Sequence, residues 1–463
     1  MTSLDIDNVV EIQREYFETN ETHSYDFRLT QLKKLQRVVL DKKEMLAQAL
    51  ISDLGRPEFE AYFELVLMYD ELKDAIKHLK KWMKATPVKT NLLSQPAKSR
   101  IEYCPLGNVL VIVPFNYPVI LAFQPLIGAI AAGNTVVIKL SELTPATSAV
   151  IAEIIADIFD SRYVCAVEGG VEESNALLTN KFDHIFFTGS PNVGKIVMSA
   201  AAKHLTPVTL ELGGKSPTIV NKDCKLDQAV KRILSGRFLN AGQTCIAPDH
   251  VYVHQDIKEA FLKEAFLKKA KETILSWYGE SPIDSKDLSR IINNRHFNRI
   301  KGLIKKENIV VGGQTDENEK FIAPTLLNDI SIDDDIMQQE IFGPVLPVLE
   351  FSDLDDVCKQ IRKLPQHPLA MYIFTNDKPF EQALIKRIRC GGVNVNNTLM
   401  HVVNSHLPFG GVGESGMGSY HGKKSFELFS HSKSIIKSAR WIDIPLRYPP
   451  YKKKVNLLKM LFR

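Results

Sequence analysis

A cysteine in a turn of small residues is the first side chain whose surroundings suggest chemistry. Cys245 ends the segment LNAGQTC (239–245), which contains a glycine and could lie at a domain cleft. A thiol acts as a nucleophile when nearby donors or the start of a helix stabilise its thiolate. A lone cysteine is otherwise more often an inert core residue, because free cysteine is among the most buried residue types. The chemistry of its neighbours therefore decides the interpretation.

Two polar residues at the ends of apolar runs could serve such a nucleophile. Glu211 ends the run PVTLE before two glycines, where a carboxylate is costly unless it is paired or used. It is either bonded to backbone donors or a general base with a raised pKa. Asn116 follows the run VIVPF, and its amide could donate to a developing oxyanion. The alternative for Asn116 is a turn residue between two prolines.

The segment FTGSPNVGK (187–195) contains a turn that could hold a phosphate. An apolar run leads into Gly189, Ser190 can cap a helix, and Pro191 suits the first helical position. Backbone N–H groups at such a helix start favour a phosphate. Only Gly189 and Gly194 are present, so the G-x-G-x-x-G dinucleotide fingerprint is incomplete. A plain strand–turn–helix unit is the alternative.

The elements that must position these residues follow two patterns. Residues 8–84 carry apolar positions at helical spacing, with a break at LGRP (54–57), and predict several amphipathic helices. From Leu106, short β-branched runs alternate with helical stretches, namely GNVLVIV, NTVVIK, YVCAVEG, DHIFFTG and PVTLELGG. A second alternating region after Cys245 includes HVYVH, VLPVLEF and LAMYIFT, with a helical stretch over residues 258–277. This predicts two α/β units with a boundary near Leu212, and residues 86–103 as an extended connection.

Composition limits the classes of protein that the chain can represent. With 463 residues and 44% hydrophobic content, it can bury a large core. Six cysteines without close pairing predict a reducing cytoplasm, no disulfide framework and no zinc site. The formal net charge of the chain is +4. Residues 452–463 contain five basic and no acidic residues, so the net charge of the rest is −1. The sequence therefore predicts no nucleic-acid-binding face, and its longest apolar run (119–132) is too short and interrupted to span a bilayer.

Taken together, the four segments supply a nucleophile, a water-activating carboxylate, an oxyanion donor and a phosphate-binding turn, the set that thiol-dependent aldehyde oxidation needs. The chain resembles the aldehyde dehydrogenase superfamily, and specifically its class 3, fatty aldehyde dehydrogenase-like branch. The resemblance covers nearly the whole chain. It is carried, in the family's order, by PFNYP (114–118), GNTVVIKLSE (133–142), FTGSPNVGK (187–195), LELGGKSP (210–217), NAGQTC (240–245), QEIFGPVLPV (339–348) and LPFGGVGESGMGSYHGKKSFELFSH (407–431). The short N-terminus, the block around 407–431 and RYPPY (447–451) favour class 3.

The resemblance implies an α/β protein with the aldehyde dehydrogenase fold. A Rossmann-like NAD-binding domain would comprise residues 1–85 and 104–212, and an α/β catalytic domain residues 213–395. A small β oligomerisation extension would include residues 86–103 and 396–440, as oligomerisation or bridging segments. Residues 441–463 would form a basic C-terminal tail.

The resemblance also implies a role for each site residue. Cys245 would be the nucleophile, Glu211 the general base for deacylation, and Asn116 with the Cys245 backbone N–H the oxyanion hole. Cofactor-binding residues would lie along the adenosine, pyrophosphate and nicotinamide in turn, namely Lys139, Glu142, Gly189, Ser190, Val193, Gly194, Leu212, Glu340 and Phe342. No metal is implied. The family's turn departs from the ordinary dinucleotide fingerprint, which accounts for the missing third glycine.

One departure from the family pattern concerns the cofactor. Leu140 stands where the family commonly has proline, between the ribose lysine and the small residue before Glu142. Lys139 and Glu142 remain, and Glu142 should accept from a ribose 2′-hydroxyl and repel a 2′-phosphate. We therefore expect NAD to be preferred, with NADP possible.

The expected reaction is NAD(P)-dependent oxidation of an aliphatic, medium- or long-chain or isoprenoid-type aldehyde to its acid. The alternatives are a CoA-acylating dehydrogenase, which the presence of Glu211 disfavours, and a catalytically silent binding protein on the same fold. We expect a cytoplasmic homodimer. Residues 452–463, with Leu457, Leu458, Leu461 and Phe462 beside lysines, are interpreted either as a peripheral contact with the inner face of a membrane or as an arm packed on the protein or its partner.

Overall fold

Helices form the N-terminal part of the chain in the computed structural model, which describes residues 3–255, 262–451 and 454–460. The Ser24 hydroxyl accepts from the Phe27 N–H and caps the second helix. The third helix ends at Gly55, whose φ of 57° suits a residue without Cβ, and Pro57 precedes the fourth. The predicted break at 54–57 is therefore confirmed. The helices are α1 (Ser3–Glu18), α2 (Tyr25–Asp41), α3 (Lys43–Leu54) and α4 (Glu58–Trp82).

A first sheet contains all five strands predicted between Leu106 and Glu211. Its order is β17–β7–β6–β3–β4–β5, parallel except for β17, and both of its faces are buried, which explains the continuous apolar runs. The strands are β3 (Asn108–Ile112), β4 (Thr135–Lys139), β5 (Val164–Val167), β6 (His184–Thr188), β7 (Val208–Glu211) and β17 (Gly416–Met417). Between and after them run α5 (Pro118–Ala132), α6 (Pro145–Ile158), α7 (Val171–Thr179) and α8 (Pro191–Ala202).

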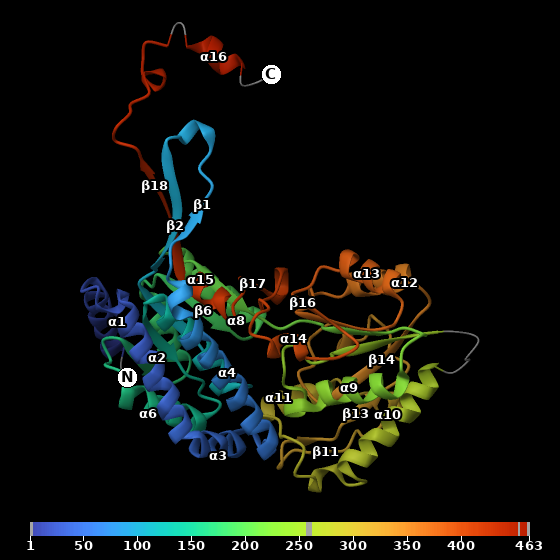
Figure 1. Ribbon diagram of the computed structural model, residues 1–463. Helices are drawn as coiled ribbons and strands as arrows, with labels where there is room; N and C mark the ends of the chain where they lie inside the picture. Colours follow the sequence, from blue (N-terminus) through green and yellow to red (C-terminus); the bar gives the residue numbers. More distant parts are fainter. Residues whose placement is uncertain (1–2, 256–261, 452–453, 461–463) are drawn as a thin grey trace.

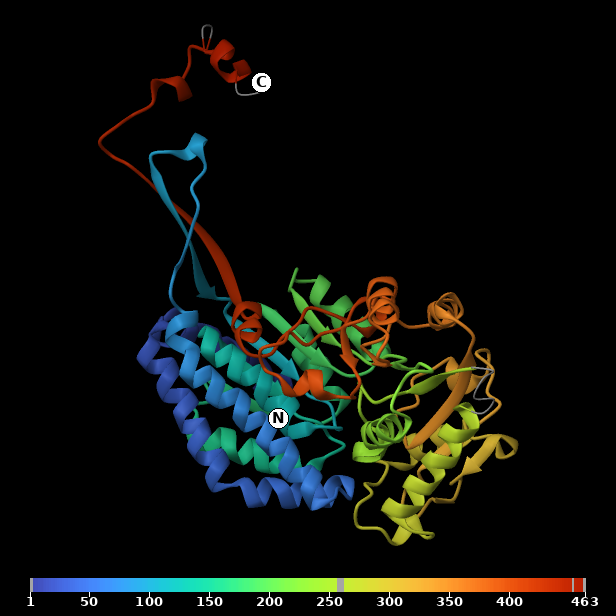
Figure 2. The same cartoon turned by 45° about the vertical axis from the view of Figure 1, so that its right-hand side comes forward.

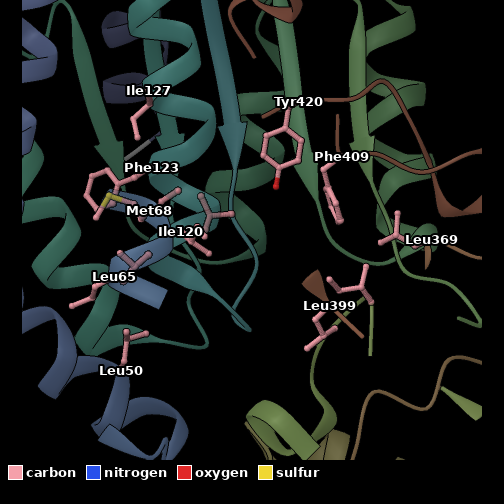
Figure 3. Packing of buried hydrophobic residues seen from close by; sticks show 14 of the residues in the cluster. Leu50, Leu65, Met68, Ile120, Phe123, Ile127, Leu369, Leu399, Phe409 and Tyr420 are labelled. Atoms are coloured by element: carbon pink, nitrogen blue, oxygen red, sulfur yellow. The ribbon is translucent and has the colours of Figure 1, made fainter. Parts of the chain in front are cut away.

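The helices cover this sheet on both faces (Figure 1). Helices α1, α7 and α8 contribute to a smaller apolar cluster on one face, and α2 to α6 to the large core on the other. In Figure 3, Leu65 and Met68 of α4 lie beside Ile120 and Phe123 of α5. The apolar run at 119–132 is thus an internal helix.

A second sheet follows, in the order β10–β13–β14–β9–β8–β15–β16, parallel except between β10 and β13. Its strands are β8 (Pro217–Val220), β9 (His250–His254), β10 (Ile309–Val311), β13 (Thr325–Leu327), β14 (Val345–Phe351), β15 (Ala370–Phe374) and β16 (Gly392–Val395), with a hairpin of β11 (Thr315–Asp316) and β12 (Phe321–Ile322). The helices here are α9 (Leu226–Phe238), α10 (Leu262–Tyr278), α11 (Asn294–Gly302), α12 (Leu354–Lys363), α13 (Lys378–Arg387) and α14 (Met400–Val403). The predicted strands are present, and α10 is the helix predicted over 258–277, of which residues 258–261 lie outside the described residues.

The chain crosses from the first sheet to the second between Glu211 and Pro217, beside the predicted boundary near Leu212. The carboxyl ends of β7 and β3 therefore face the second unit.

A third, antiparallel sheet projects from the body as an arm (Figures 1 and 2). It consists of β1 (Thr86–Val88), β2 (Ala97–Pro105) and β18 (Ser430–Ser438), with β2 in the centre. From the predicted segment 396–440, only β18 joins the arm, while β17 and α15 (Lys423–Leu428) pack on the first unit. Beyond β18 the chain continues to α16 (Val455–Met460). Among the described helices, none is long and apolar enough to cross a membrane.

Candidate active site

The turn before Cys245 has an unusual backbone. It follows α9 as a short 3-10 segment, Leu239–Gly242, in which Asn240 and Ala241 have φ angles of 53° and 51°. Residues with a Cβ are disfavoured in this left-handed region, at a cost of roughly 1–2 kcal/mol each. Surrounding contacts must hold such a turn in place.

Asn116 is one of the residues that hold it. Its side-chain Nδ2 donates to the Gln243 carbonyl at 3.1 Å, and its own carbonyl accepts from Asn240 Nδ2 at 2.9 Å. Because an amide nitrogen carries two hydrogens, the second N–H of Asn116 can serve an oxyanion near Cys245. Tyr117 completes the contact, since its hydroxyl lies 2.7 Å from the Thr244 hydroxyl. The two loops that sequence reasoning paired are in direct contact.

Glu211 lies at the carboxyl end of β7 and is only 3% exposed. Neither of its carboxyl oxygens has a hydrogen-bond partner among the described residues, and burial raises its pKa well above the usual value. An unpaired carboxyl at this depth is poised to hold or take up a proton. Of the two interpretations offered by the sequence, the structure supports the desolvated acid rather than a carboxylate bonded to backbone donors.

The thiol of Cys245 faces two acidic groups. Burial, then Glu340, then Glu211 raise its pKa to about 12, while the backbone N–H groups of Cys245 and Ile246 act in the opposite direction. These N–H groups are the donors that stabilise a thiolate once it forms. The thiol is therefore protonated at rest, next to carboxyl groups that can accept its proton.

Glu340 and Phe342 lie on a loop that is held to the second unit by hydrogen bonds from buried charged side chains. Asp249 accepts from the Ile341 N–H at 3.0 Å and forms an ion pair with Lys215, and Arg299 donates to the Glu340 carbonyl at 3.2 Å. Burial raises the pKa of Glu340 to about 8. Its carboxyl lies against Gly213, where an added Cβ would come within 1.9 Å of a carboxyl oxygen. The loop thus meets the strand end that carries Glu211.

The segment predicted to hold a phosphate has the strand–turn–helix structure that the sequence indicated. The Ser190 hydroxyl accepts from the Val193 N–H at 3.4 Å and caps α8, with Pro191 at its start. The Gly189 N–H donates to the Glu211 carbonyl at 3.0 Å, which ties this turn to β7. A Cβ on Gly194 would lie 2.8 Å from a methyl of Leu212. The turn, Leu212 and Glu211 are therefore packed as one unit.

The surface beside this turn combines exposed apolar side chains with a lysine and a glutamate. Three apolar side chains at the starts of α7 and α8 are exposed, namely Val171, Val193 and Ile196. Lys139 ends β4, donates to the Leu140 and Gly169 carbonyls at 2.6 Å each, and lies 3.8 Å from the half-exposed Glu142 carboxylate. Leu140, between these two residues, is buried. These groups could hold a ribose and its base.

Sequence reasoning missed the charged residues at the start of α4. Arg56, Glu60 and Glu64 reach the loops of Asn116 and Cys245. Burial, followed by the neighbouring Glu211 and Cys245, raises the pKa of Tyr420 well above its usual value. The only sequence signal was that two glutamates four residues apart follow the break at 54–57, which puts them on one helix face. Within the described residues, no group of three or more His, Cys, Asp and Glu side chains is placed to hold a metal ion.

Comparison with known proteins identifies the family of the chain. The family model described as Aldehyde dehydrogenase family matches residues 1–435, so the chain belongs to the aldehyde dehydrogenase family.

The class 3 branch is also supported. The chain is 45% identical to the 4,4'-diaponeurosporen-aldehyde dehydrogenase of Staphylococcus aureus (strain NCTC 8325 / PS 47), over 97% of each chain. It is likewise 45% identical to aldehyde dehydrogenase family 3 member A2 of Macaca fascicularis, over 94% of this chain and 90% of the relative. A solved structure described as the substrate-bound state of Staphylococcus aureus AldH superposes with a TM-score of 0.95 at 44% identity, covering 99% of both chains. The predicted fold and family are confirmed, and the chain is an NAD(P)-dependent enzyme that oxidises aldehydes.

Proposed function

We propose that Cys245 is the nucleophile of this oxidation. The observation that carries the proposal is the meeting of Cys245, Glu211 and the Asn116 amide where the first sheet faces the second unit. The thiol proton passes through a neighbouring carboxylate, Glu211 or Glu340, to solvent, and the sulfur forms a bond to the aldehyde carbon. The second Asn116 N–H and the Cys245 backbone N–H then hold the new oxyanion.

Two-electron oxidation of that carbon gives a thioester on Cys245. The nicotinamide of the bound cofactor supplies the hydride acceptor for this step. Glu211 next takes a proton from water, the oxygen of which attacks the thioester carbonyl. The C–S bond breaks, the carboxylic acid leaves, and Cys245 is restored.

The cofactor groups are assigned by position. The cap of α8 with Ser190 and Gly194 would hold the pyrophosphate, and Lys139 with Glu142 the adenosine ribose. Glu340 and Phe342 would lie along the nicotinamide riboside. The carboxylate of Glu142 favours a ribose that carries a free 2′-hydroxyl, so NAD is the preferred cofactor.

The substrate is an aldehyde with an apolar chain. Aromatic side chains lie on one side of the thiol, because Tyr420 lies near Cys245 and its ring packs edge-to-face on Phe409, with 5.8 Å between the ring centroids. In Figure 3, Phe409 lies beside Tyr420 and Leu399 lies below them. The name of the Staphylococcus aureus relative gives an isoprenoid aldehyde as its substrate, which agrees with a long aliphatic or isoprenoid chain here.

We also propose a homodimer joined through the arm. Large apolar side chains near its tip and along the following segment are exposed, among them Leu92, Leu93, Ile436 and Trp441. Arg447 donates to the Leu93 carbonyl, so the segment after β18 lies against the arm. The basic tail then offers Leu458 and Lys459 to an anionic lipid surface, whereas Leu461, Phe462 and Lys452–Lys453 lie outside the described residues. A cytoplasmic location remains a prediction from the cysteine content.

Single-turnover measurements test the chemistry. We expect Cys245→Ser to give no NADH from a long-chain aldehyde, because an alcohol in this site lacks the thiol's nucleophilicity. Glu211→Gln should give one equivalent of NADH and then stop, with an acyl group retained on Cys245 that mass spectrometry detects. Free acid as the product, both with and without added CoA, excludes the CoA-acylating alternative. Wild-type turnover by Cys245→Ser would refute the assignment.

A further inference from the structure

Charged residues just before α4 and in its first two turns reach into the catalytic loops. Arg56 and Glu64 form an ion pair in which both side chains are fully buried. Glu64 also accepts from the Val119 and Ile120 N–H groups at 2.8 and 2.9 Å, at the start of α5. The guanidinium of Arg56 donates to the Asn116 carbonyl. This pair therefore fixes the loop that carries Asn116.

Glu60 lies one helical turn before Glu64 and contacts a different partner. Its Oε2 accepts from the Asn240 backbone N–H at 2.9 Å and from the Ser289 hydroxyl at 3.3 Å. The hydrogen bond to Asn240 joins residues 180 positions apart in the sequence. It reaches the first of the two left-handed residues that precede Cys245.

The Asn240 turn depends on external contacts. Asn240 and Ala241 both adopt positive φ without being glycine, so the surrounding structure must over-determine this conformation. The side chain of Asn240 is held by the Asn116 and Gln243 carbonyls, and its backbone N–H by Glu60. Without Glu60, the Asn240 N–H would have no side-chain acceptor, and the turn would lose one of the hydrogen bonds that hold it.

We propose that Glu60 is a positioning residue that, by accepting the Asn240 N–H, holds the turn in the conformation that places the Cys245 thiol beside the Asn116 amide. The inference rests on the proposed function of Cys245 and Asn116. In this role Glu60 acts through the turn and not on the reacting atoms.

The acceptor oxygen of Glu60, rather than its charge, carries this role. Arg56 already has Glu64 as its ion-pair partner. Burial raises the pKa of Glu60 to about 7 in spite of Arg56, so a neutral carboxyl is readily formed at this position. A carboxamide of the same length offers the same oxygen to Asn240, whereas a thioether of similar volume offers only a weak acceptor.

The experiment compares Glu60→Met with Glu60→Gln in the full-length enzyme. We expect Glu60→Met to lower kcat on the order of ten- to hundredfold, as a displaced reacting group does, with the KM for NAD within about twofold of wild type. Glu60→Gln should restore kcat to within about threefold of wild type. Glu58→Gln is the matched control, since Glu58 is exposed on the same helical turn and should leave both constants unchanged.

Three results separate the possible explanations. Wild-type kcat in Glu60→Met, or equal loss in Glu60→Gln and Glu60→Met, would overturn the positioning role. A proportional rise in the KM for NAD with a lower melting temperature in both variants would show general destabilisation and would also overturn it. Cys245→Ser is measured in parallel, because activity in that variant would refute the proposed nucleophile independently of Glu60.

Discussion

The thiol of Cys245 is surrounded by groups that oppose its ionisation. Burial and the carboxyl groups of Glu340 and Glu211 raise its pKa, and only backbone N–H groups favour the thiolate. Nucleophilic attack therefore requires that a neighbouring carboxylate first takes the proton. The rate of attack by Cys245 therefore depends on whether the neighbouring carboxyl groups are ionised.

A pH dependence follows from Glu211. Burial raises its pKa, so the base is protonated and inactive at a pH where an ordinary glutamate is ionised. We expect the rate of thioester hydrolysis to rise with pH as Glu211 ionises and then to level off. Stopped-flow measurement of the step after the NADH burst, from pH 5 to 10, would show this. A flat profile from pH 5 upward would contradict a raised pKa.

Asn116 provides a second residue-scale prediction. Asn116→Ala removes the side-chain donor of the oxyanion hole, and loss of one such donor typically lowers kcat by about 10²–10³-fold. Residual activity should remain, because the Cys245 backbone N–H is still present. Steady-state kinetics with one aldehyde would test it. A fall of less than threefold would argue against the donor role.

The three proposed reacting residues could be recognised from sequence because each lies directly at the end of an apolar strand or in a turn of small residues. Arg56 and Glu60 could not. Their importance depends on α4 lying against loops 60 and 180 positions away, and no local pattern records such a contact. The positive φ angles of Asn240 and Ala241 could not be predicted for a similar reason, because neither residue type requires this conformation.

At the scale of elements, the close contact between α8 and the end of β7 should control cofactor binding. Gly194→Ala would place a methyl 2.8 Å from the Leu212 side chain and push apart the turn and the strand. We expect the Kd for NAD to rise about tenfold, as a small displacement at a binding loop can cost this much. Fluorescence titration measures it.

Gly302→Ala is the control for Gly194→Ala. An added Cβ at Gly302 meets no atom within 4 Å, so NAD binding should be unchanged. An unchanged Kd in Gly194→Ala would show that the Leu212 side chain moves aside without affecting the cofactor turn.

The central strands were easier to predict than the arm. Strands buried on both faces, such as β3 and β4, read as continuous β-branched runs. Strand β2 is partly exposed along its length and mixes charged with apolar residues, so the sequence indicated only an extended segment. Its pairing with β18 is set by a strand from the other end of the chain, which local patterns do not contain.

At the scale of the whole molecule, the arm predicts the state of assembly. Leu92 and Leu93 are 79% and 66% exposed at its tip, too much apolar surface for an unpartnered projection. We expect Leu92→Asp with Leu93→Asp to convert a dimer into a monomer at micromolar concentration, since charges are depleted from interface cores. Light scattering after gel filtration would show it. Lys89→Asp, a change of charge in the same arm, is the control and should leave the mass unchanged.

The pairing of β2 with β18 has a consequence for how the chain acquires its structure during synthesis. Strand β2 ends at Pro105, but its partner β18 begins only at Ser430. Likewise, the partner of β7, strand β17, begins only at Gly416. While the ribosome is still making the intervening chain, both strands keep an open edge, and open edges invite pairing with other chains. Such distant pairing is slow to form and exposes the nascent chain to aggregation. The edge of β7, the strand that ends at Glu211, is therefore covered only when almost the entire chain has left the ribosome.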